Sequence, residues 1–506
     1  MANEPSCDEV LVFGNGVSIA IAGNSLVVKD STTAKRNRTK FCGFPLGSAP
    51  AGFSIPLYNV LWAEIADNAL VIDYATPASP KKHVRAAKLR YELGEQPAHA
   101  IESWIEVLLA KAYKTAQRQK RAKVLVNPHA GPGGAVKVWE HEVRPLFEAA
   151  HMTLDVVRTT HSGEAVDICA QLDIDAYDIV IPCSGDGLPY EVFNGLGKRP
   201  DARRALHQLA VAHIPCGSGN AMSCNLNGTH RPSLAALAII KGVRTPIDLM
   251  SVTQGSTRTL SFLSQSVGII AEADLGTENL RWLGAARFNV GIIERIFSKR
   301  VYPCDIAVKV EINDKAEVKA HYRRDREADD FQERKEGGSS SLITDESTGA
   351  SEAETGGDGL PPLRFGTIND KVPDDWETGS YDKLGNFYCG NMAWMAPDAN
   401  FFTAACANDG LMDVVVNDGD LSPIKYVELM TSVENGKFFD NPLVSYRKVA
   451  AYRFTPRDQQ HGYISIDGER VPFEPFQVEV HQGLGTVISK TGRYEAPGPL
   501  GWESTS

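Results

Sequence analysis

Residues 182–196 read Pro-Cys-Ser-Gly-Asp-Gly-Leu-Pro-Tyr-Glu-Val-Phe-Asn-Gly-Leu. They follow a short apolar run at 178–181, which predicts a buried strand. A strand that ends in Ser-Gly-Asp-Gly before a helix places flexible backbone and one carboxylate at the carboxyl edge of a sheet, where open α/β folds bind ligands. Asp186, between the two glycines, can take a proton from a hydroxyl or help to hold Mg²⁺.

Two further strand–loop–helix units accompany this stretch. Residues 123–126 predict a strand before the glycine-rich loop 127–134, and residues 209–212 predict a strand before the loop 215–221. Three such units in succession predict a parallel sheet with its loops gathered at one edge. Each loop offers free backbone N–H groups and a helix N-terminus, which suit an anionic phosphate.

Composition limits the classes of protein that need to be considered. The chain has 506 residues, of which 43% are hydrophobic and 23% charged, and this balance is typical of a globular protein with about two to four domains. Its net charge of -11 argues against a general nucleic-acid binder. Nine scattered cysteines and no signal peptide predict a cytoplasmic protein. No stretch is apolar enough to span a bilayer, so we expect any membrane contact to be peripheral.

The first half of the chain predicts two domains. Residues 1–97 contain several short strands separated by turns and predict a β-rich N-terminal module. Residues 98–250 predict a Rossmann-like α/β nucleotide-binding domain, which begins with a helix at 98–119 that has one apolar face. Within the first module, the basic stretch from Lys29 to Lys40 and Cys42 is either a solvated loop or a patch for anionic lipid with an acylation site.

The second half predicts a third domain and a tail. Residues 251–495 predict a C-terminal β-rich domain of a sandwich-like kind, which would bind the lipid part of a substrate, and residues 496–506 form a tail. The domain is interrupted at 322–377 by an insert of charged and small residues with little apolar content. Such an insert cannot bury a core, so we expect it to be disordered.

These motifs together resemble the diacylglycerol-kinase-like lipid kinases, and within them the sphingosine kinases, which phosphorylate sphingoid long-chain bases. Leu188 after the Ser-Gly-Asp-Gly loop, Glu191-Val and Asn194-Gly-Leu match the sphingosine kinases. The resemblance covers roughly residues 98–310 and 385–490. It implies transfer of the γ-phosphoryl group of ATP, with Mg²⁺, to the primary hydroxyl of a sphingoid base, with Asp186 as the general base.

The resemblance also implies site residues outside the three loops. In the segment 273–288, Asp274 would hold the lipid headgroup, with Glu191 nearby, and Arg281 and Arg287 would contact ATP phosphates. The turn at Asp467, Gly468 and Glu469 would reach back to the nucleotide. Without the resemblance, the first of these segments predicts only a charged helix and the second only a hairpin turn.

The remaining nucleotide contacts would come from the glycine-rich loops. They are Asn127, Gly131, Thr160, Ser184, Gly185, Gly187, Gly217, Ser218, Gly219 and Asn220. A Gly-Lys-Ser/Thr P-loop is absent, the spacing does not fit a dinucleotide-binding loop, and the ligands of the metal are left open. Asn391, Met392 and Trp394 are candidates for the acyl slot, although core packing explains each of them as well.

Other functions remain open at this point. A kinase of the same fold could act on ceramide, diacylglycerol or NAD, and a catalytically silent lipid-binding scaffold would belong to a different class. The expected partners are a sphingoid-base substrate and a peripheral membrane surface, with a homodimer as a further option and no nucleic acid. The ammonium group of a sphingoid base favours that substrate, since a carboxylate such as Asp274 pairs with a cation.

Overall fold

The computed structural model describes residues 10–13, 16–30, 52–78, 83–94, 96–131, 133–276, 300–336, 358–459 and 461–502. These residues form two compact units, which we describe separately. Unit 1 comprises the chain up to Lys120 together with residues 137–153 and 231–243, and unit 2 comprises the rest. The first long helix, α2 (Ala98–Tyr113), therefore groups with the N-terminal strands, so the boundary does not fall between residues 97 and 98 as the sequence predicts.

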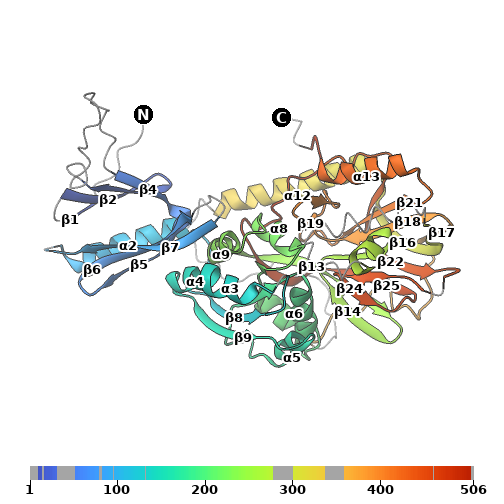
Figure 1. Ribbon diagram of the computed structural model, residues 1–506, viewed down its shortest axis with the longest axis horizontal. Coiled ribbons are helices and arrows are strands. Elements are labelled where there is room, and N and C mark those ends of the chain that lie inside the picture. Colours follow the sequence, from blue (N-terminus) through green and yellow to red (C-terminus); the bar gives the residue numbers. More distant parts are fainter. Residues whose placement is uncertain are drawn as a thin grey trace. The chain divides into compact units, whose positions relative to one another are not determined.

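Unit 1 contains two antiparallel sheets and a helix that covers one of them. The first sheet holds β1 (Val10–Phe13), β2 (Val17–Ala22), β3 (Ser25–Asp30) and β4 (Gly52–Pro56), in that order. The second sheet holds β5 (Val60–Ala66), β6 (Ala69–Ala78) and β7 (His83–Glu92). Helix α2 packs along β5 (Figure 1). The strand prediction for this module is confirmed, because alternate residues of β2 are buried as a half-exposed strand requires.

Three helical segments from later in the chain complete unit 1. They are the π-helical turn η4 (Trp139–Val143), α4 (Arg144–Ala149) and α9 (Pro232–Lys241), and the short α3 (Ala135–Val138) leads into them. Both α4 and α9 pack on β7. Sequence order alone could not indicate this grouping, since these helices lie within the stretch that we assigned to the α/β domain.

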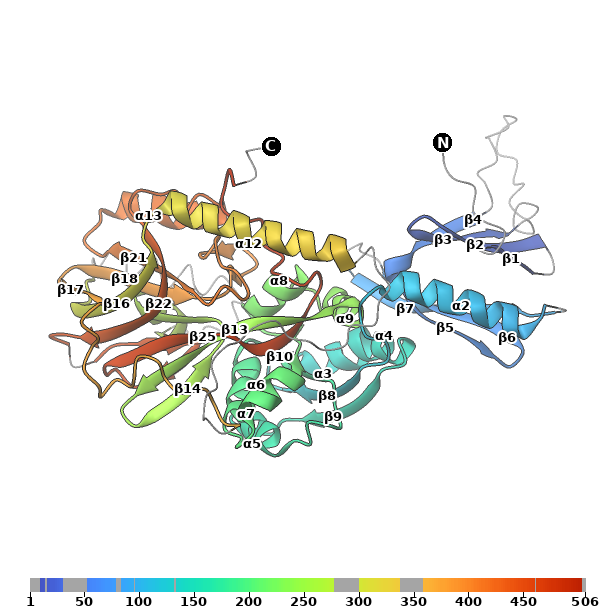
Figure 2. The same ribbon diagram turned by 180° about the vertical axis from the view of Figure 1, so that it is seen from behind.

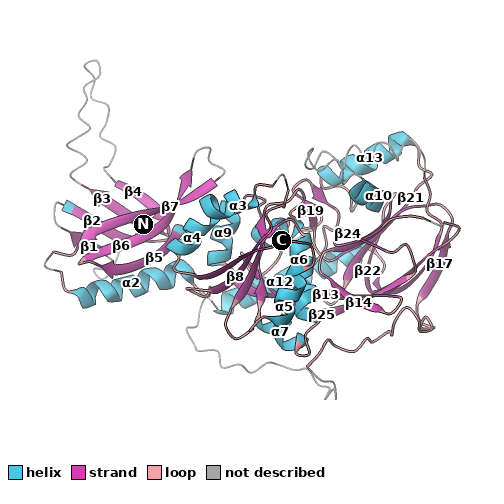
Figure 3. Ribbon diagram, turned by 60° about the horizontal axis from the view of Figure 1, so that its bottom comes forward, coloured by secondary structure: helices cyan, strands magenta, loops and turns pink. Residues whose placement is uncertain are grey.

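Unit 2 begins with the predicted parallel sheet. Its strands run in the order β9 (Thr153–Arg158), β8 (Arg121–Val126), β10 (Ile179–Ser184) and β11 (Ala210–Val211), and the short β12 (Ile214–Pro215) also pairs with β10. The helices are α5 (Glu164–Gln171), α6 (Gly187–Gly197), α7 (Ala202–Gln208) and α8 (Ala221–Asn227). Helix α6 packs against both α5 and α7, and the three lie together in Figure 3. Since β8, β10 and β12 are parallel, the loops that follow them meet at one edge of the sheet.

The later strands continue the same sheet rather than forming a separate one. Strand β25 (Phe476–Ser489) is parallel to β11 on one side and antiparallel to β22 (Ser445–Pro456) on the other. Beyond β22 follow β21 (Met412–Asp418), β18 (Leu384–Gly390), β15 (Ser264–Gly268), β23 (Ile464–Ile466) and β24 (Glu469–Val471). The elements beside this path are β13 (Val243–Gln254), β14 (Thr257–Ser261), α10 (Ile269–Gly276), β16 (Cys304–Ile312), β17 (Glu377–Tyr381), β19 (Trp394–Ala396), β20 (Ala399–Asn400) and α13 (Pro423–Glu434).

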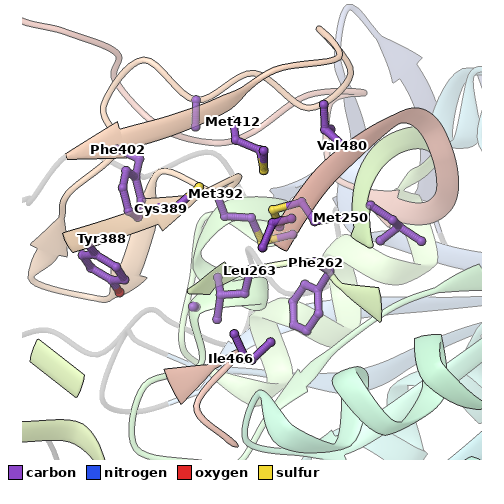
Figure 4. Close-up of a cluster of buried hydrophobic side chains, with 14 of the residues drawn as sticks. Met250, Phe262, Leu263, Tyr388, Cys389, Met392, Phe402, Met412, Ile466 and Val480 are labelled. Atoms are coloured by element: carbon purple, nitrogen blue, oxygen red, sulfur yellow. The ribbon is translucent and has the colours of Figure 1, made fainter. Parts of the chain in front are cut away.

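One hydrophobic core of unit 2 extends from the parallel strands and their helices into the antiparallel strands. Figure 4 shows part of this core, with buried side chains from strands and from the loops between them, among them Met250, Phe262, Cys389, Met392, Met412, Ile466 and Val480. Met392 is fully buried in this cluster, and Asn391 is buried beside it with its side-chain amide donating to the carbonyl of Asp248. Core packing is therefore the correct interpretation of both residues.

The prediction that the insert 322–377 is disordered is wrong at both ends of this range. Residues 322–336 belong to the long helix α12 (Lys315–Glu336), drawn in yellow in Figure 2. Tyr322 is buried, and Arg323 donates to the carbonyl oxygen of Trp502. At the other end, the backbone N–H groups of Arg364 and Phe365 donate to the carboxylate of Glu479. A few hydrogen bonds hold these polar segments in place, and amino-acid composition cannot indicate such contacts. Residues 337–357 of the predicted insert lie outside the described residues.

The predicted tail at 496–506 is also anchored over its described part. Arg326 on α12 donates to the carbonyl oxygens of Tyr494 and Ala496, and the Trp502 ring packs edge-on against the Tyr322 ring. Residues 496–502 therefore pack on α12 and belong to the folded part of unit 2.

Candidate functional site

A cavity of about 920 Å³ opens in unit 2 at the carboxyl edge of the parallel strands. The loops after β8, β10 and β12 form one wall, as the strand–loop–helix pattern predicts, and the loop after β9 joins them. The opposite wall comes from residues 263–266, α10, the segment 395–401, one face of α13 and the turn after β23. Most of the predicted site residues lie in this lining: Asn127, Gly131, Thr160, Ser184, Gly185, Asp186, Gly187, Glu191, Gly217, Ser218, Gly219, Asp274, Asp467, Gly468 and Glu469.

The carboxylate of Asp186 is held by backbone groups at the start of α8. Its Oδ2 accepts a hydrogen bond from the N–H of Ala221 and its Oδ1 accepts one from the N–H of Met222, both at 3.0 Å. Its side chain retains 15% exposure, and Asp186 lines the cavity. The two N–H donors fix the orientation of the carboxylate, so a reacting hydroxyl in the cavity would meet an aligned proton acceptor.

The glycines of the loops allow three backbone segments to meet beside Asp186. A Cβ atom on Gly217 would lie 2.4 Å from the Cα atom of Gly185, and one on Gly131 would lie 2.5 Å from the carbonyl oxygen of Cys216. Gly131 also has a φ of +53°, a backbone angle that residues with a Cβ atom rarely adopt. The glycine-rich sequence therefore serves close packing of the loops and leaves their N–H groups near the cavity.

Two predicted nucleotide contacts have local structural roles. The side chain of Asn220 accepts from the N–H of Gly217 at 2.7 Å and donates back to its carbonyl oxygen at 2.8 Å, which closes the loop. Asn220 is buried and does not line the cavity. Thr160 lines the cavity, but its hydroxyl donates to Glu164 in the first turn of α5, so it fixes the start of that helix.

The turn between β23 and β24 reaches the loop that carries Asp186. Oε1 of Glu469 lies 2.9 Å from the position that a Cβ atom on Gly187 would occupy. Asp467 is fully buried in the same turn, and its carboxylate accepts from the hydroxyl of Ser261 and from the N–H groups of Phe262, Leu263 and Ser264. Burial raises the pKa of Asp467 to about 6. Because these contacts occupy both of its oxygens, Asp467 fixes the cavity wall, whereas the carboxylate of Glu469 approaches Gly187.

The two carboxylates predicted for the headgroup differ in their surroundings. Asp274, at the end of α10, accepts a hydrogen bond from the hydroxyl of Ser465 at 3.3 Å and lines the cavity. Glu191, on α6, also lines the cavity but accepts from the N–H of Ala165 at 3.2 Å and from the hydroxyl of Ser162 at 3.5 Å. Glu191 therefore orients the loop before α5. Arg281 and Arg287 lie outside the described residues.

The sequence did not indicate the apolar wall of the cavity. Phe401 and Met395 contribute to it, as do Val427, Met430 and Val433 of α13, a helix that also brings Thr431 and Glu434 into the lining. Their spacing of three and four residues is a signal for one helix face, but the same spacing fits ordinary core packing. Trp394, the third candidate for an acyl slot, does not line the cavity.

A second group of ionisable side chains lies away from the cavity. Nε2 of His321, Sγ of Cys406 and a carboxylate oxygen of Asp409 lie within 4.8 Å of one another, a donor set that could hold a metal ion. However, Oδ2 of Asp409 already contacts both His321 at 2.9 Å and the fully buried ammonium of Lys448 at 2.8 Å. Since a cation already occupies this position, we assign the group to ion pairing.

Across the described ranges, no helix has both the length and the apolar character needed to cross a membrane.

Two known families match parts of the chain. A domain of unknown function matches residues 9–114, which lie in unit 1, and the diacylglycerol kinase catalytic domain matches residues 121–252. The second match starts at β8, so α2 lies outside it. The part of unit 2 that carries the glycine-rich loops thus has a diacylglycerol-kinase-like fold, with a mixed sheet and helices, and a β-rich region precedes it.

Several relatives match over most of the chain. Sphingoid long chain base kinase 4 of Schizosaccharomyces pombe is 33% identical over 472 residues, which cover 93% of this chain and 95% of the relative. Sphingoid long chain base kinase 5 of Saccharomyces cerevisiae is 35% identical over 77% of this chain, and the match spans only 62% of that longer relative. Sphingosine kinase 1 of Arabidopsis thaliana is 29% identical over 74% of this chain and 76% of its own length.

Proposed function

The chain belongs to the sphingoid long-chain-base kinase family, and we propose that it transfers the γ-phosphoryl group of ATP to the primary hydroxyl of a sphingoid base. One observation carries this proposal. Asp186, an aligned carboxylate, lines the same cavity as the glycine-rich loops on one side and Asp274 on the other. A phosphate donor and a cationic lipid alcohol could therefore meet in front of one proton acceptor.

The chain's own residues account for the transfer step. The free N–H groups of the loops around Gly131, Gly185 and Ser218 would bind the phosphates, because these loops line the cavity. Asp186 would take the proton of the hydroxyl while the new O–P bond forms and the bond from the γ-phosphorus to the oxygen of ADP breaks. Arg281 and Arg287 remain proposed phosphate contacts on the strength of the sequence resemblance.

The carboxylates at the Asp186 loop suit a divalent cation. Oε1 of Glu469 lies beside Gly187, which follows Asp186, and the side chains of both acidic residues line the cavity. Oxygen donors of this kind fit Mg²⁺, which when bound supplies charge neutralisation at the phosphates. Asp467 is not part of this proposal, because it is buried and holds four hydrogen bonds from residues 261–264, whereas Asp186 is partly exposed to the cavity.

The lipid would enter from the side of the cavity opposite the glycine-rich loops. Asp274 would pair with the ammonium group of the base, and the apolar wall of Phe401, Met430 and Val427 would hold part of the chain. A long-chain base resides in membranes, so we propose that the enzyme works at a membrane surface without crossing it. Sedimentation with vesicles that contain sphinganine tests this part of the proposal, and protein that stays in the supernatant would contradict it.

The proposal is tested by phosphate transfer from labelled ATP, with Mg²⁺, to sphinganine, ceramide and diacylglycerol in parallel. We expect label on sphinganine alone. Asp274→Asn removes the anionic partner of the ammonium group, so it should raise KM for sphinganine about tenfold or more while KM for ATP changes little. Label on ceramide or diacylglycerol would replace the substrate, and no label on any acceptor would overturn the kinase function.

A further inference from the structure

Three neighbouring strands place a row of hydroxyl groups in the wall of the cavity. Ser266 on β15 lies directly opposite Ser465 of β23 on one side and opposite Tyr388 of β18 on the other, in antiparallel pairs. All three residues are buried and line the cavity. Opposite residues of paired strands hold their Cβ atoms about 5 Å apart on one face of the sheet. The three side chains therefore form a continuous row, which we call the hydroxyl row.

Strand alternation directs the hydroxyl row toward the cavity, because the residues on both sides of Ser266 face the core. The side-chain amide of Gln265 donates to the hydroxyl of Ser261 at 2.7 Å and accepts from the hydroxyl of Tyr452 at 3.0 Å. Val267 lies in the hydrophobic core. Since successive side chains of a strand point to opposite faces, the side chain of Ser266 points away from the core, toward the cavity that it lines.

The two ends of the hydroxyl row meet the two parts of the proposed lipid site. At one end, the hydroxyl of Ser465 donates to Oδ2 of Asp274 at 3.3 Å. At the other end, the ring of Tyr388 packs edge-on against the ring of Phe401, which belongs to the apolar wall. Ser266 therefore lies between the carboxylate proposed for the ammonium group and the wall proposed for the hydrocarbon chain.

The hydroxyl of Ser266 is the group in this row that a substrate could satisfy. Ser465 uses its hydroxyl on Asp274, whereas the hydroxyl of Ser266 makes no hydrogen bond with any described residue. A hydrocarbon chain at this position would exclude water from Ser266 and offer no partner, and a buried polar group without a partner costs free energy. A substrate that presents its own hydroxyl there removes this cost.

We propose that Ser266 is a specificity-determining residue that hydrogen-bonds a hydroxyl group on the fourth carbon of the base, so that 4-hydroxysphinganine is preferred over sphinganine. The inference rests on the proposed function, in which the hydroxyl on the first carbon meets Asp186 and the ammonium on the second carbon meets Asp274. The hydroxyl on the third carbon then stays beside Asp274. The hydroxyl on the fourth carbon lies one carbon closer to the apolar wall, in the direction in which Ser266 follows Ser465 by about 5 Å.

Three substitutions in the hydroxyl row separate this role from a general effect on the headgroup. Ser266→Ala removes the hydroxyl with little change in volume, and it should lower the ratio of kcat/KM for 4-hydroxysphinganine to that for sphinganine about three- to tenfold. Ser266→Thr keeps a hydroxyl on a side chain that suits a strand, so this ratio should stay close to that of the wild type. Ser465→Ala removes a donor to Asp274, so KM should rise for both bases, which share the ammonium group, and their ratio should stay the same.

Steady-state kinetics of the full chain, with both bases at equal surface concentration in mixed detergent micelles, provide the first readout. For the wild type we expect kcat/KM to be about three- to tenfold higher with 4-hydroxysphinganine. The difference should lie in KM rather than kcat, because the fourth carbon is remote from the reacting atoms. Equal ratios in the wild type and Ser266→Ala would overturn the proposal, as would a wild-type preference for sphinganine.

A second readout does not depend on turnover. Displacement of a fluorescent sphinganine from the full chain, without ATP, gives the Kd of each base. We expect 4-hydroxysphinganine to bind about three- to tenfold more tightly than sphinganine to the wild type and to Ser266→Thr, and to lose this advantage in Ser266→Ala. This pattern without phosphate transfer to any lipid would overturn the kinase proposal and support the role of Ser266. Phosphate transfer without the pattern would do the reverse.

Discussion

Asp186 and Asp413 are carboxylates of the same unit that the fold holds in opposite ways. Asp186 lies at the cavity, partly exposed, and backbone N–H groups hold its two oxygens. Asp413 on β21 has no exposure and lies 3.2 Å from the ammonium of Lys448 on β22, which also contacts Asp409 at 2.8 Å. Backbone donors orient a carboxylate and leave it open to a substrate, whereas a side-chain cation closes it off. Changes in the first region should therefore affect turnover, and changes in the second should affect stability.

The largest effect should come from Asp186→Asn. It removes the charge and proton affinity of the side chain at almost the same volume, so we expect turnover with sphinganine to fall about a thousandfold. The melting temperature should change little, since an amide oxygen can still accept one of the two backbone bonds. Asp440→Asn, which only weakens an exposed pair with Lys319, is the control and should leave turnover unchanged. An Asp186→Asn enzyme with most of its activity would show that another group accepts the proton.

Lys448→Met should produce the opposite pattern. It leaves Asp409 and Asp413 buried without their cation, and we expect the free energy of unfolding to fall by about 3 to 5 kcal/mol in urea titrations. Lys383→Met breaks the exposed ion pair with Asp420 and should cost less than about 1 kcal/mol. Protein that remains folded should retain its KM for ATP. If Lys448→Met and Lys383→Met lowered the free energy of unfolding equally, the buried ion pair would have no special role in stability.

Close packing of the loops provides a sharper test within the cavity region. In Gly217→Ala the new Cβ atom would lie 2.4 Å from Cα of Gly185, so the loops must separate, at a cost of about 1 to 3 kcal/mol in stability. Because the displaced loop carries the proposed phosphate donors, KM for ATP should rise about tenfold. Gly134→Ala, where no atom lies within 4 Å of the new Cβ, should match the wild type in both measurements.

The smallest effect should be a pH dependence of stability from Asp413. Burial raises its pKa from 3.8 to about 6, so between these values the folded chain keeps a proton that the unfolded chain has lost. This contribution is complete below about pH 4 and is lost as pH rises through about 6, and after the influence of Lys448 we expect it to be on the order of 1 kcal/mol. Urea unfolding of wild type and Asp413→Asn from pH 4.5 to about 7.5 should show a flatter profile in the variant. Parallel profiles would mean that Asp413 is ionised throughout the range.

The two regions also differ in how far the sequence predicts them. Asp186 and its loops could be found because a buried strand, a glycine-rich loop and a helix follow one another within about fifteen residues. The pairing of Lys448 with Asp409 could not be found, since the residues are 39 positions apart and neither stands in a motif. The same limit explains the insert, where Glu479 of β25 holds the backbone of Arg364 and Phe365. The buried ion pair and the ordered part of the insert both depend on contacts between segments that are distant in the sequence, which neither composition nor a local motif indicates.

The place of β25 in the sheet has a consequence for how the protein is made. This strand lies between β11 and β22, so it joins the parallel and the antiparallel strands, although it follows every other strand of the sheet along the chain. While the ribosome synthesises the preceding segments, β11 and β22 both present open edges that could pair with other chains. Folding of unit 2 should therefore be completed only after residue 489 has left the exit tunnel. Chaperones that shield strand edges would then set the yield of this enzyme in the cell.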